Sequence, residues 1–523
     1  MYFEHPLIRK QCVQLREYQE ELARRASRSS TLLVLPTGLG KTVVAAMVIA
    51  EVLHQKGGKV LFLAPTRPLV EQHKRTLEAM IEGKSIGMMT GEVDPVEREL
   101  IFLESDIIAT TPQVVANDLK HGRMDLKDVK LIVFDEAHRA VGNYAYVFVA
   151  KEYMDNDGLV LGMTASPGND KEKIKEVCQN LNIRDIEVRT ERDPDVAKYV
   201  QSIRMDWVEV DLPLEMHRIA GALQALYEQY IKELVDLGVV DKDRVLNKRY
   251  LLEMAATWQA RLRGGERSRS LYKAISAQAK AVKVEHALDL VETQGMSSLK
   301  AYLERLREEA SSEAGSKASR DIVSSSRFQD IWALAKAVKA EHPKLSRVMG
   351  VVARQLSESP SSKILVFTHY RDTCELVVSK LSRVDGVRAA KLVGQSDRKG
   401  EKGQRQKEQV GTLERFRQGE FNVLVATSVG EEGLDVASTD LVVFYEPVPS
   451  EIRSIQRRGR TGRSRAGKVV ILITKGTRDE AYYYSSLNKE KAMRRRLADM
   501  KDELSEGKGN VSKEGVQRTL GDF

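Results

Sequence analysis

Two stretches of the chain repeat one pattern, in which a short apolar run of strand length is followed by a segment of helix length. The runs occupy residues 31–35, 59–64, 106–110, 131–134 and 159–163 in the first stretch, and 363–368, 421–427, 441–445 and 468–474 in the second. They are apolar at most positions, which is typical of parallel strands covered on both faces. The pattern therefore predicts two α/β lobes, each built on a doubly wound parallel sheet.

A helical pattern separates the two lobes. Residues 204–343 show long helical periodicity and few strand candidates apart from 205–212. We assign residues 1–203 to the first lobe, 204–343 to a helical insert, 344–497 to the second lobe and 498–523 to a polar, flexible tail. Residues 242–283 hold eleven Lys or Arg against three Asp or Glu, in a chain of net charge +8. This excess favours a polyanionic partner, and a solvated basic face is the alternative interpretation.

A candidate phosphate-binding loop, PTGLGKT, lies between the first strand and the next helix, at residues 36–42. Glycines bring backbone N–H groups close to an anion, and a helix N-terminus adds a favourable dipole. Lys41 is expected to reach the β- and γ-phosphates of ATP, and Thr42 to bind Mg²⁺. Leu35 stands where the common form of this loop has its first glycine. The other loop residues expected at the nucleotide are Thr37, Gly38 and Gly40.

Two further sets of charged residues complete a candidate catalytic site. Asp135 and Glu136 end a buried strand at the sheet edge where α/β proteins bind ligands. Asp135 suits a metal ion, and Glu136 suits the orientation and deprotonation of an attacking water. In QRRGRTGR, Arg460 and Arg463 are spaced to share a helix face and are predicted to reach across a cleft to the γ-phosphate. Gln456 opens this segment and is placed in the same catalytic set.

Ten motifs occur in the order of superfamily 2 helicases, which the chain resembles over both lobes. They are LREYQ, PTGLGKT, APTRPLVEQH, TG, ATTPQ, DEAH, TASP, VFTHY, ATSVGEEGLDV and QRRGRTGR. Longer segments such as FDEAHRAVGNYAYVFVAKEY and KGTRDEAYYYSS resemble the archaeal Hef helicases, relatives of the Fanconi anaemia group M motor. The XPF-type nuclease region that follows the motor in Hef is expected to be absent, since the chain ends at Phe523.

The resemblance implies a role for each matched position. Gln19 would read the adenine edge, and Gly433 and Asp435 would lie beside the ribose or the finger arginines. Hydrolysis would be coupled to lobe movement through His138, Thr164 and Ser166. The expected contacts with the nucleic-acid backbone are Pro65, Thr66, Arg67, Thr90, Gly91, Thr111 and Pro112 in the first lobe and Thr368 and Thr427 in the second. The insert would grip branched or duplex DNA through Arg261, Arg263, Arg267 and Arg269.

The resemblance also implies what the chain does. Two tandem RecA-like lobes would form an ATP- and Mg²⁺-dependent 3′ to 5′ DNA helicase, acting on forked or Holliday-junction DNA in the repair of stalled replication forks. A double-stranded RNA-activated ATPase and a clamp-tethered DNA-binding scaffold with a dead motor are the alternatives.

Partners and location are further expectations. The terminal residues Gln517, Leu520 and Phe523 fit a peptide that binds a sliding clamp, and a separate nuclease is a possible partner. Because no signal-peptide or membrane-spanning run is present, we expect a cytoplasmic, nucleoid-associated protein.

Overall fold

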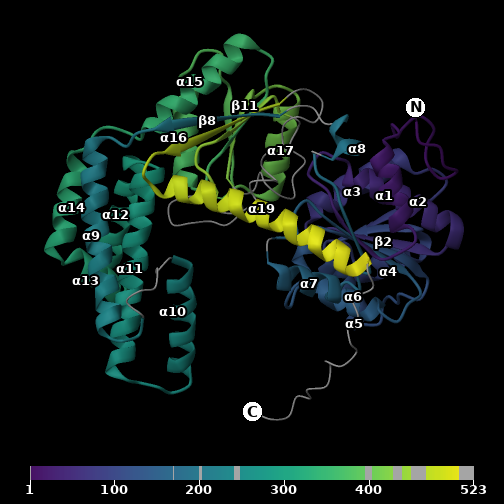
Figure 1. The fold of residues 1–523 in the computed structure, drawn as a ribbon, viewed down its shortest axis with the longest axis horizontal. Coiled ribbons are helices and arrows are strands. Elements are labelled where there is room, and N and C mark those ends of the chain that lie inside the picture. The colour runs from purple at the N-terminus through teal and green to yellow at the C-terminus, as the bar shows by residue number, and fades with distance from the viewer. Residues whose placement is uncertain are drawn as a thin grey trace.

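The computed structural model consists of two α/β lobes and a helical domain, joined by one long C-terminal helix (Figure 1). It describes residues 2–168, 170–191, 193–199, 203–240, 248–394, 403–427, 439–448 and 467–505. The predicted fold class, two parallel-sheet lobes with a helical domain between them in the sequence, is confirmed.

The first lobe is a seven-stranded sheet in the order β3-β4-β2-β5-β6-β1-β7, with every described pair parallel. Its strands are β1 (Thr31–Val34), β2 (Lys59–Leu63), β3 (Ile86–Met89), β4 (Ile107–Thr110), β5 (Val129–Asp135), β6 (Leu159–Thr164) and β7 (Asp185–Val188). Leu32 and Val34 pack into the core on one face, and Leu33 packs into the core on the other. Burial on both faces explains why the strands are apolar at successive positions.

Helices cover both faces of this sheet. They are α1 (Glu17–Ala26), α2 (Lys41–Lys56), α3 (Arg67–Met80), α4 (Pro95–Glu104), α5 (Pro112–Lys120), α6 (Ala145–Tyr153), α7 (Lys171–Asn180) and α8 (Pro194–Ala197), with a short 3-10 turn, η1 (Ala137–Arg139).

The second lobe is a six-stranded parallel sheet in the order β10-β11-β9-β12-β13-β8. Its strands are β8 (Ile203–Val210), β9 (Ile364–Phe367), β10 (Ala389–Leu392), β11 (Val423–Ala426), β12 (Leu441–Phe444) and β13 (Gly467–Thr474). The helices packed on it are α15 (Pro343–Glu358), α16 (Arg371–Leu381) and α17 (Gln406–Arg417). Strand β8 corrects one boundary: residues 204–210, assigned to the insert, pair with β13 along their whole length.

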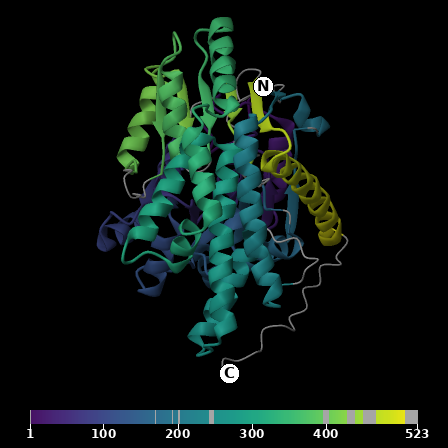
Figure 2. The same cartoon turned by 90° about the vertical axis from the view of Figure 1, so that its left-hand side faces the viewer.

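The helical domain is held together by its own apolar core, which includes Leu223, Leu288 and Leu299. Its helices are α9 (Leu214–Asp236), α10 (Lys248–Arg263), α11 (Arg269–Thr293), α12 (Met296–Ser311), α13 (Lys317–Val323) and α14 (Ser326–Ala337). The long helices of the domain lie side by side (Figure 2).

The last described helix, α19 (Arg478–Ser505), starts beside the second sheet and ends against the first lobe (Figure 1). It corrects the expected start of the tail, since residues 498–505 continue this helix. It also corrects the lobe boundary, because Met493 and Leu497 lie in the core of the first lobe. Among the described residues, no helix is both long enough and apolar enough to cross a membrane.

Candidate ATP and nucleic-acid site

The predicted first-lobe motifs gather at one edge of the first sheet, because all its strands are parallel and their carboxyl ends lie together. Thr90, Thr111 and Thr66 follow the neighbouring strands β3, β4 and β2. Asp135, Thr164 and the loop 35–40 lie at the ends of the next three strands, β5, β6 and β1. The expected nucleic-acid contacts and the expected ATP contacts therefore occupy adjacent halves of one edge.

The loop before α2 has the conformation that close approach to an anion requires. Gly38 and Gly40 have φ angles of 91° and 84°, in the region that favours glycine. A Cβ atom added at Gly40 would lie 2.3 Å from Gln19 Nε2. Gly40 is the N-cap residue of α2 and, as a glycine, has no side chain to cap this helix terminus. The first-turn N–H groups of α2 thus have the arrangement that favours an anion.

Gln19 and Tyr18 fix the loop from the side of α1. Gln19 Nε2 donates a hydrogen bond to the Leu39 carbonyl at 2.9 Å, and the Tyr18 hydroxyl donates to the same oxygen at 2.8 Å. Both side chains are almost fully buried. Lys41 Nζ lies 3.0 Å from the Leu35 carbonyl, which keeps the ammonium group next to the loop.

Asp135 is a buried carboxylate held by a histidine. Its Oδ2 lies 2.8 Å from His73 Nε2, and both residues are 5% exposed. Burial alone would raise the pKa of Asp135, but the neighbouring His73 and Lys41 outweigh burial and keep this pKa below its ordinary value. The carboxylate is therefore ionised at neutral pH, as a metal ligand must be.

Glu136 begins a chain of contacts that runs to the TASP motif. Its backbone is left-handed, with φ 50° and ψ 50°, which is uncommon for a residue other than glycine. Glu136 Oε2 lies 3.3 Å from His138 Nδ1, and the same nitrogen lies 3.1 Å from Thr164 Oγ1. The Thr164 hydroxyl donates to the Ser166 carbonyl at 2.9 Å. The structure thus brings together the three expected coupling residues beside Glu136.

Two helix N-termini lie among the expected backbone contacts of the first lobe. Thr66 precedes α3 and Thr111 precedes α5, and neither side chain forms a capping hydrogen bond. Arg67 forms ion pairs with Glu71, at 2.9 Å, and with Glu92. A phosphate contact by Arg67 would therefore compete with two carboxylates. The remaining positions of this set are Pro65, Thr90, Gly91 and Pro112, of which Thr90 and Pro112 are buried.

The second lobe and the helical domain carry the other described candidates. Thr368 and Thr427 follow the neighbouring strands β9 and β11, and both are buried. Arg261 forms a two-bond ion pair with Glu266, at 2.7 and 2.8 Å. The remaining arginines, Arg263, Arg267 and Arg269, are exposed where α10 leads into α11.

Some predicted site residues lie outside the described residues. They are Gly433, Asp435, Gln456, Arg460, Arg463, Gln517, Leu520 and Phe523.

The structure also shows three residues to which the sequence analysis gave no role. His73 lies within the quoted motif APTRPLVEQH, but nothing in its spacing indicates a contact with Asp135, 62 positions away. Tyr146 donates a hydrogen bond to the Asp135 carbonyl at 2.6 Å. Met493 contacts Ser166 from α19, 327 positions along the chain.

The two lobes, the helical domain and this sheet edge are those of the DEAD/DEAH box class of helicases. The DEAD/DEAH box helicase family matches residues 16–174, and the helicase conserved C-terminal domain matches residues 344–465. A family described as the helical bundle of an ATP-dependent RNA helicase matches residues 215–344.

The chain belongs to the Hef helicase family. It is 45% identical to the Hef helicase domain of Pyrococcus furiosus, a crystal structure that matches with a TM-score of 0.70 over 92% of this chain and 100% of that one. The resemblance expected from the motifs is confirmed.

Two curated relatives are longer than this chain. A relative from Methanocaldococcus jannaschii, named as an ATP-dependent RNA helicase, is 41% identical over 96% of this chain and 63% of its own length. The ATP-dependent DNA helicase mph1 of Neurospora crassa is 33% identical over 90% of this chain and 42% of its own length. The chain therefore spans about two thirds or less of these relatives.

Proposed function

We propose that this chain is the motor of a DNA helicase that moves 3′ to 5′ along one strand of forked or Holliday-junction DNA and acts in the repair of stalled replication forks. The observation that carries the proposal is the shared sheet edge, where the expected backbone contacts on β3, β4 and β2 adjoin the expected ATP contacts on β5, β6 and β1. Binding and hydrolysis of ATP at one half of the edge would then alter the contacts with the nucleic-acid backbone at the other half. The DNA helicase named among the relatives supports DNA as the substrate.

The residues present fit a magnesium nucleotide. The uncapped terminus of α2 and Lys41 supply donors for the phosphates, and the ionised Asp135 with the Thr42 hydroxyl supplies the hard oxygen ligands that Mg²⁺ prefers. Glu136 Oε2 is buried and, within the described part of the chain, has no hydrogen-bond donor of good geometry, which suits a group that accepts a proton. Bound Mg²⁺-ATP supplies the phosphoanhydride whose cleavage drives the cycle.

In this mechanism each residue has one task. Lys41 and the loop glycines hold the phosphates, Asp135 and Thr42 hold the cation, and Glu136 orients the attacking water and accepts its proton. Arg460 and Arg463 would reach from the second lobe and neutralise the charge that develops on the γ-phosphate.

Two variants test these assignments. Glu136→Gln should keep ATP and DNA binding and lower kcat by about 100-fold or more. Arg460→Ala should slow hydrolysis far more than it weakens DNA binding. Normal hydrolysis by Glu136→Gln would remove the assigned base.

The substrate is tested by stimulation of ATP hydrolysis. Forked DNA, a four-way junction, plain duplex DNA and duplex RNA should be compared at one salt concentration, because phosphate contacts make affinity salt-dependent. We expect the branched DNAs to stimulate most. The RNA alternative has its own support in the names of the M. jannaschii relative and of the helical-bundle family. Stronger stimulation by duplex RNA would overturn the choice of DNA.

The helical domain is proposed to grip the DNA duplex. Arg263, Arg267 and Arg269 are exposed at the α10–α11 turn, whereas Arg261 is already paired with Glu266. Replacing Arg267 and Arg269 by Ala should weaken branched-DNA binding and reduce its salt dependence. Arg261→Ala is the matched control and should change binding less.

Sliding-clamp binding and a separate nuclease partner are part of the same proposal. Gln517, Leu520 and Phe523 fit a clamp-binding peptide. Phe523→Ala should abolish co-elution with the clamp while leaving ATP hydrolysis unchanged. The nuclease should co-purify with the tagged full chain.

A further inference from the structure

The far end of α19 is built into the first lobe. Met493 and Leu497 are 4% and 1% exposed and pack in the same core as Ile174, Val177 and Ile186 of α7 and β7. Their spacing of four places both on one face of the helix. The end of a helix that starts at the second lobe is therefore a structural part of the first.

This end of α19 contacts the coupling residues directly. The Ser166 hydroxyl donates a hydrogen bond to Met493 Sδ at 2.8 Å, and Ser166 is 1% exposed. Ser166 N–H in turn donates to Thr164 Oγ1 at 3.1 Å, and Thr164 contacts His138. An unbroken line of contacts thus leads from Glu136 to α19.

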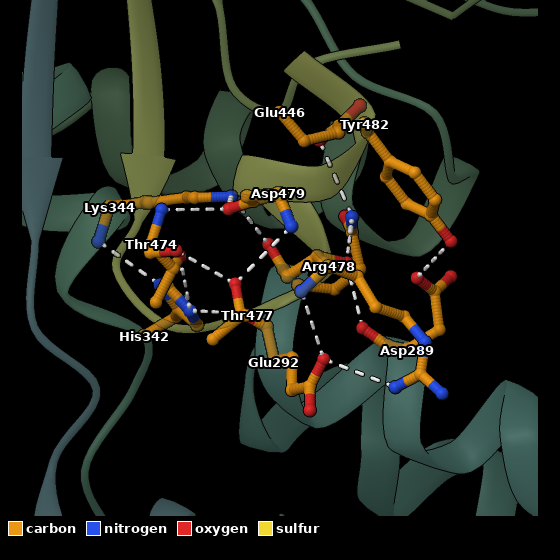
Figure 3. Close-up of polar contacts among 12 residues, drawn as sticks. Asp289, Glu292, His342, Lys344, Glu446, Thr474, Thr477, Arg478, Asp479 and Tyr482 are labelled. Atoms are coloured by element: carbon orange, nitrogen blue, oxygen red, sulfur yellow. Dashed lines mark hydrogen bonds and ion pairs between the residues drawn. The ribbon is translucent and has the colours of Figure 1, made fainter. Parts of the chain in front are cut away.

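The near end of α19 is fixed by a group of polar residues, of which Lys344 and Asp479 are buried and the others partly buried (Figure 3). We name this group the junction cluster; its members are Asp289, Glu292, Lys344, Arg478, Asp479 and Tyr482. Arg478 Nη1 contacts Glu292 Oε2 at 3.1 Å, and the Tyr482 hydroxyl contacts Asp289 Oδ1 at 3.3 Å, which ties α19 to α11 of the helical domain. Lys344 forms an ion pair with Asp479, and both side chains are 0% exposed.

The two ends of α19 are held by different kinds of polar contact. A helix of 28 residues is about 40 Å long and resists bending as long as its backbone hydrogen bonds hold. The junction cluster contains a buried ion pair, whose partners are costly to separate. At the other end, the contact with Ser166 uses a thioether, which is a weak acceptor. When the lobes move relative to each other, the stiff helix would carry the displacement into the first-lobe core, where the weak contact of Met493 with Ser166 can change.

We propose that α19 is a connecting rod between the junction cluster and the coupling motif, and that Met493 is a positioning residue that sets Ser166 according to the separation of the lobes. The rod would link the helical domain, which holds branched DNA in the proposed function, to the site of hydrolysis. The test of this inference with DNA rests on the proposed function. The test with nucleotide alone does not rest on it.

Continuity of the rod is tested at Asn488, an exposed residue between the two ends. Asn488→Pro breaks the helix, and Asn488→Ala removes the same side chain while keeping the helix. Met493→Leu tests the contact itself, since it keeps the volume and removes the sulfur. Met493→Leu also guards against misfolding, because it conserves the volume of the core and keeps the helix, which Asn488→Pro does not.

The DNA readout is the ratio of DNA-stimulated to basal kcat. Asn488→Pro and Met493→Leu should lower this ratio roughly fivefold or more with the KM for ATP unchanged, and Asn488→Ala should match the wild type. Wild-type ratios in both Asn488→Pro and Met493→Leu would overturn the proposal.

The nucleotide readout is hydrogen exchange of residues 486–497, with and without a non-hydrolysable ATP analogue. Wild-type exchange should change on nucleotide addition, and the change should be lost in Met493→Leu. If nucleotide does not change hydrogen exchange in the wild type, the proposal that α19 is a connecting rod is overturned. Failure of branched DNA to stimulate ATP hydrolysis by the wild type would instead overturn the proposed function. The hydrogen-exchange result would then still decide whether α19 is a connecting rod.

Discussion

The ion pair between Lys344 and Asp479 is the sharpest point at which to perturb the junction cluster. Lys344→Met keeps the length of the side chain and removes its charge. Lys344 Nζ also donates a hydrogen bond to the Thr293 carbonyl at 3.2 Å, and this bond is lost as well. Asp479 would keep the hydrogen bond that the Thr474 N–H donates to its Oδ2 at 2.9 Å, which carries no full charge. The change therefore leaves a carboxylate buried without a counter-charge.

The expected cost follows from this geometry. Removing one partner of a fully buried ion pair costs roughly 3–5 kcal/mol in the free energy of unfolding. The double variant Lys344→Met/Asp479→Asn removes both charges and keeps an acceptor for the Thr474 N–H. Its cost should be about 1–2 kcal/mol, so the second change should restore part of the stability that the first removes.

The pKa of Asp479 determines how the stability penalty of Lys344→Met changes with pH. Burial raises the pKa of Asp479 despite the opposing effect of Lys344, and loss of Lys344 would raise this pKa further. A carboxyl group with a raised pKa in the folded state loses stability as pH rises through that pKa. The penalty of Lys344→Met should therefore be large at pH 8 and smaller at pH 5.

Tryptophan fluorescence during urea unfolding is the assay, because all three tryptophans report on the relevant part of the molecule. Trp207 lies on β8 of the second sheet, and Trp258 and Trp332 lie in the helical domain. The reasoning is refuted if the single variant loses no more stability than the double variant, or if its penalty is the same at pH 5 and pH 8.

Three further predictions concern other parts of the molecule. Gly40→Ala should weaken ATP-analogue binding by about tenfold or more in calorimetry, because the loop must change its φ and move away from Gln19. Burial lowers the pKa of His342 to about 3, so the unfolded chain binds a proton near pH 6.5 that the folded chain does not. Wild-type stability should therefore fall by up to about 1.4 kcal/mol per pH unit below pH 6.5 in urea titrations, with a shallower slope in His342→Asn. Arg98→Met should destabilise the first lobe by roughly 1.5–3 kcal/mol, seen as faster hydrogen exchange in its sheet, because the buried Asp118 loses its two-bond partner and keeps Arg123, at 3.0 Å.

The central strands were predictable from the sequence and the edge strands were not. Every interior strand carries the apolar run expected of a strand buried on both faces. Three of the four edge strands, β3, β7 and β10, are not predictable in this way, because Gly87, Glu187 and Lys391 interrupt their apolar runs. The fourth, β8, is predictable as a strand, but its place in the second sheet is not, since its pairing with β13 joins segments more than 250 residues apart.

The candidate site was predictable where its chemistry is local. Lys41 and Asp135 each lie at a strand end, and the parallel sheet then brings these ends together. Contacts of His73 with Asp135 and of Met493 with Ser166 depend on helix placement across the sheet, which periodicity does not encode. The left-handed backbone of Glu136 was equally unpredictable, because its side chain carries no preference for that conformation.

Helix α3 connects the two halves of the sheet edge that are proposed to bind nucleic acid and ATP. It begins directly after Thr66, with Arg67 as its first residue, in the region proposed to contact the nucleic-acid backbone. Two turns later, His73 lies 2.8 Å from the metal-binding candidate Asp135 and packs against Phe62, with ring centroids 4.5 Å apart. Since a helix transmits displacement along its axis, a phosphate that pulls on the start of α3 also moves the partner of Asp135. In the proposed function, nucleic-acid binding and hydrolysis would then be coupled within the first lobe, before any movement of the second.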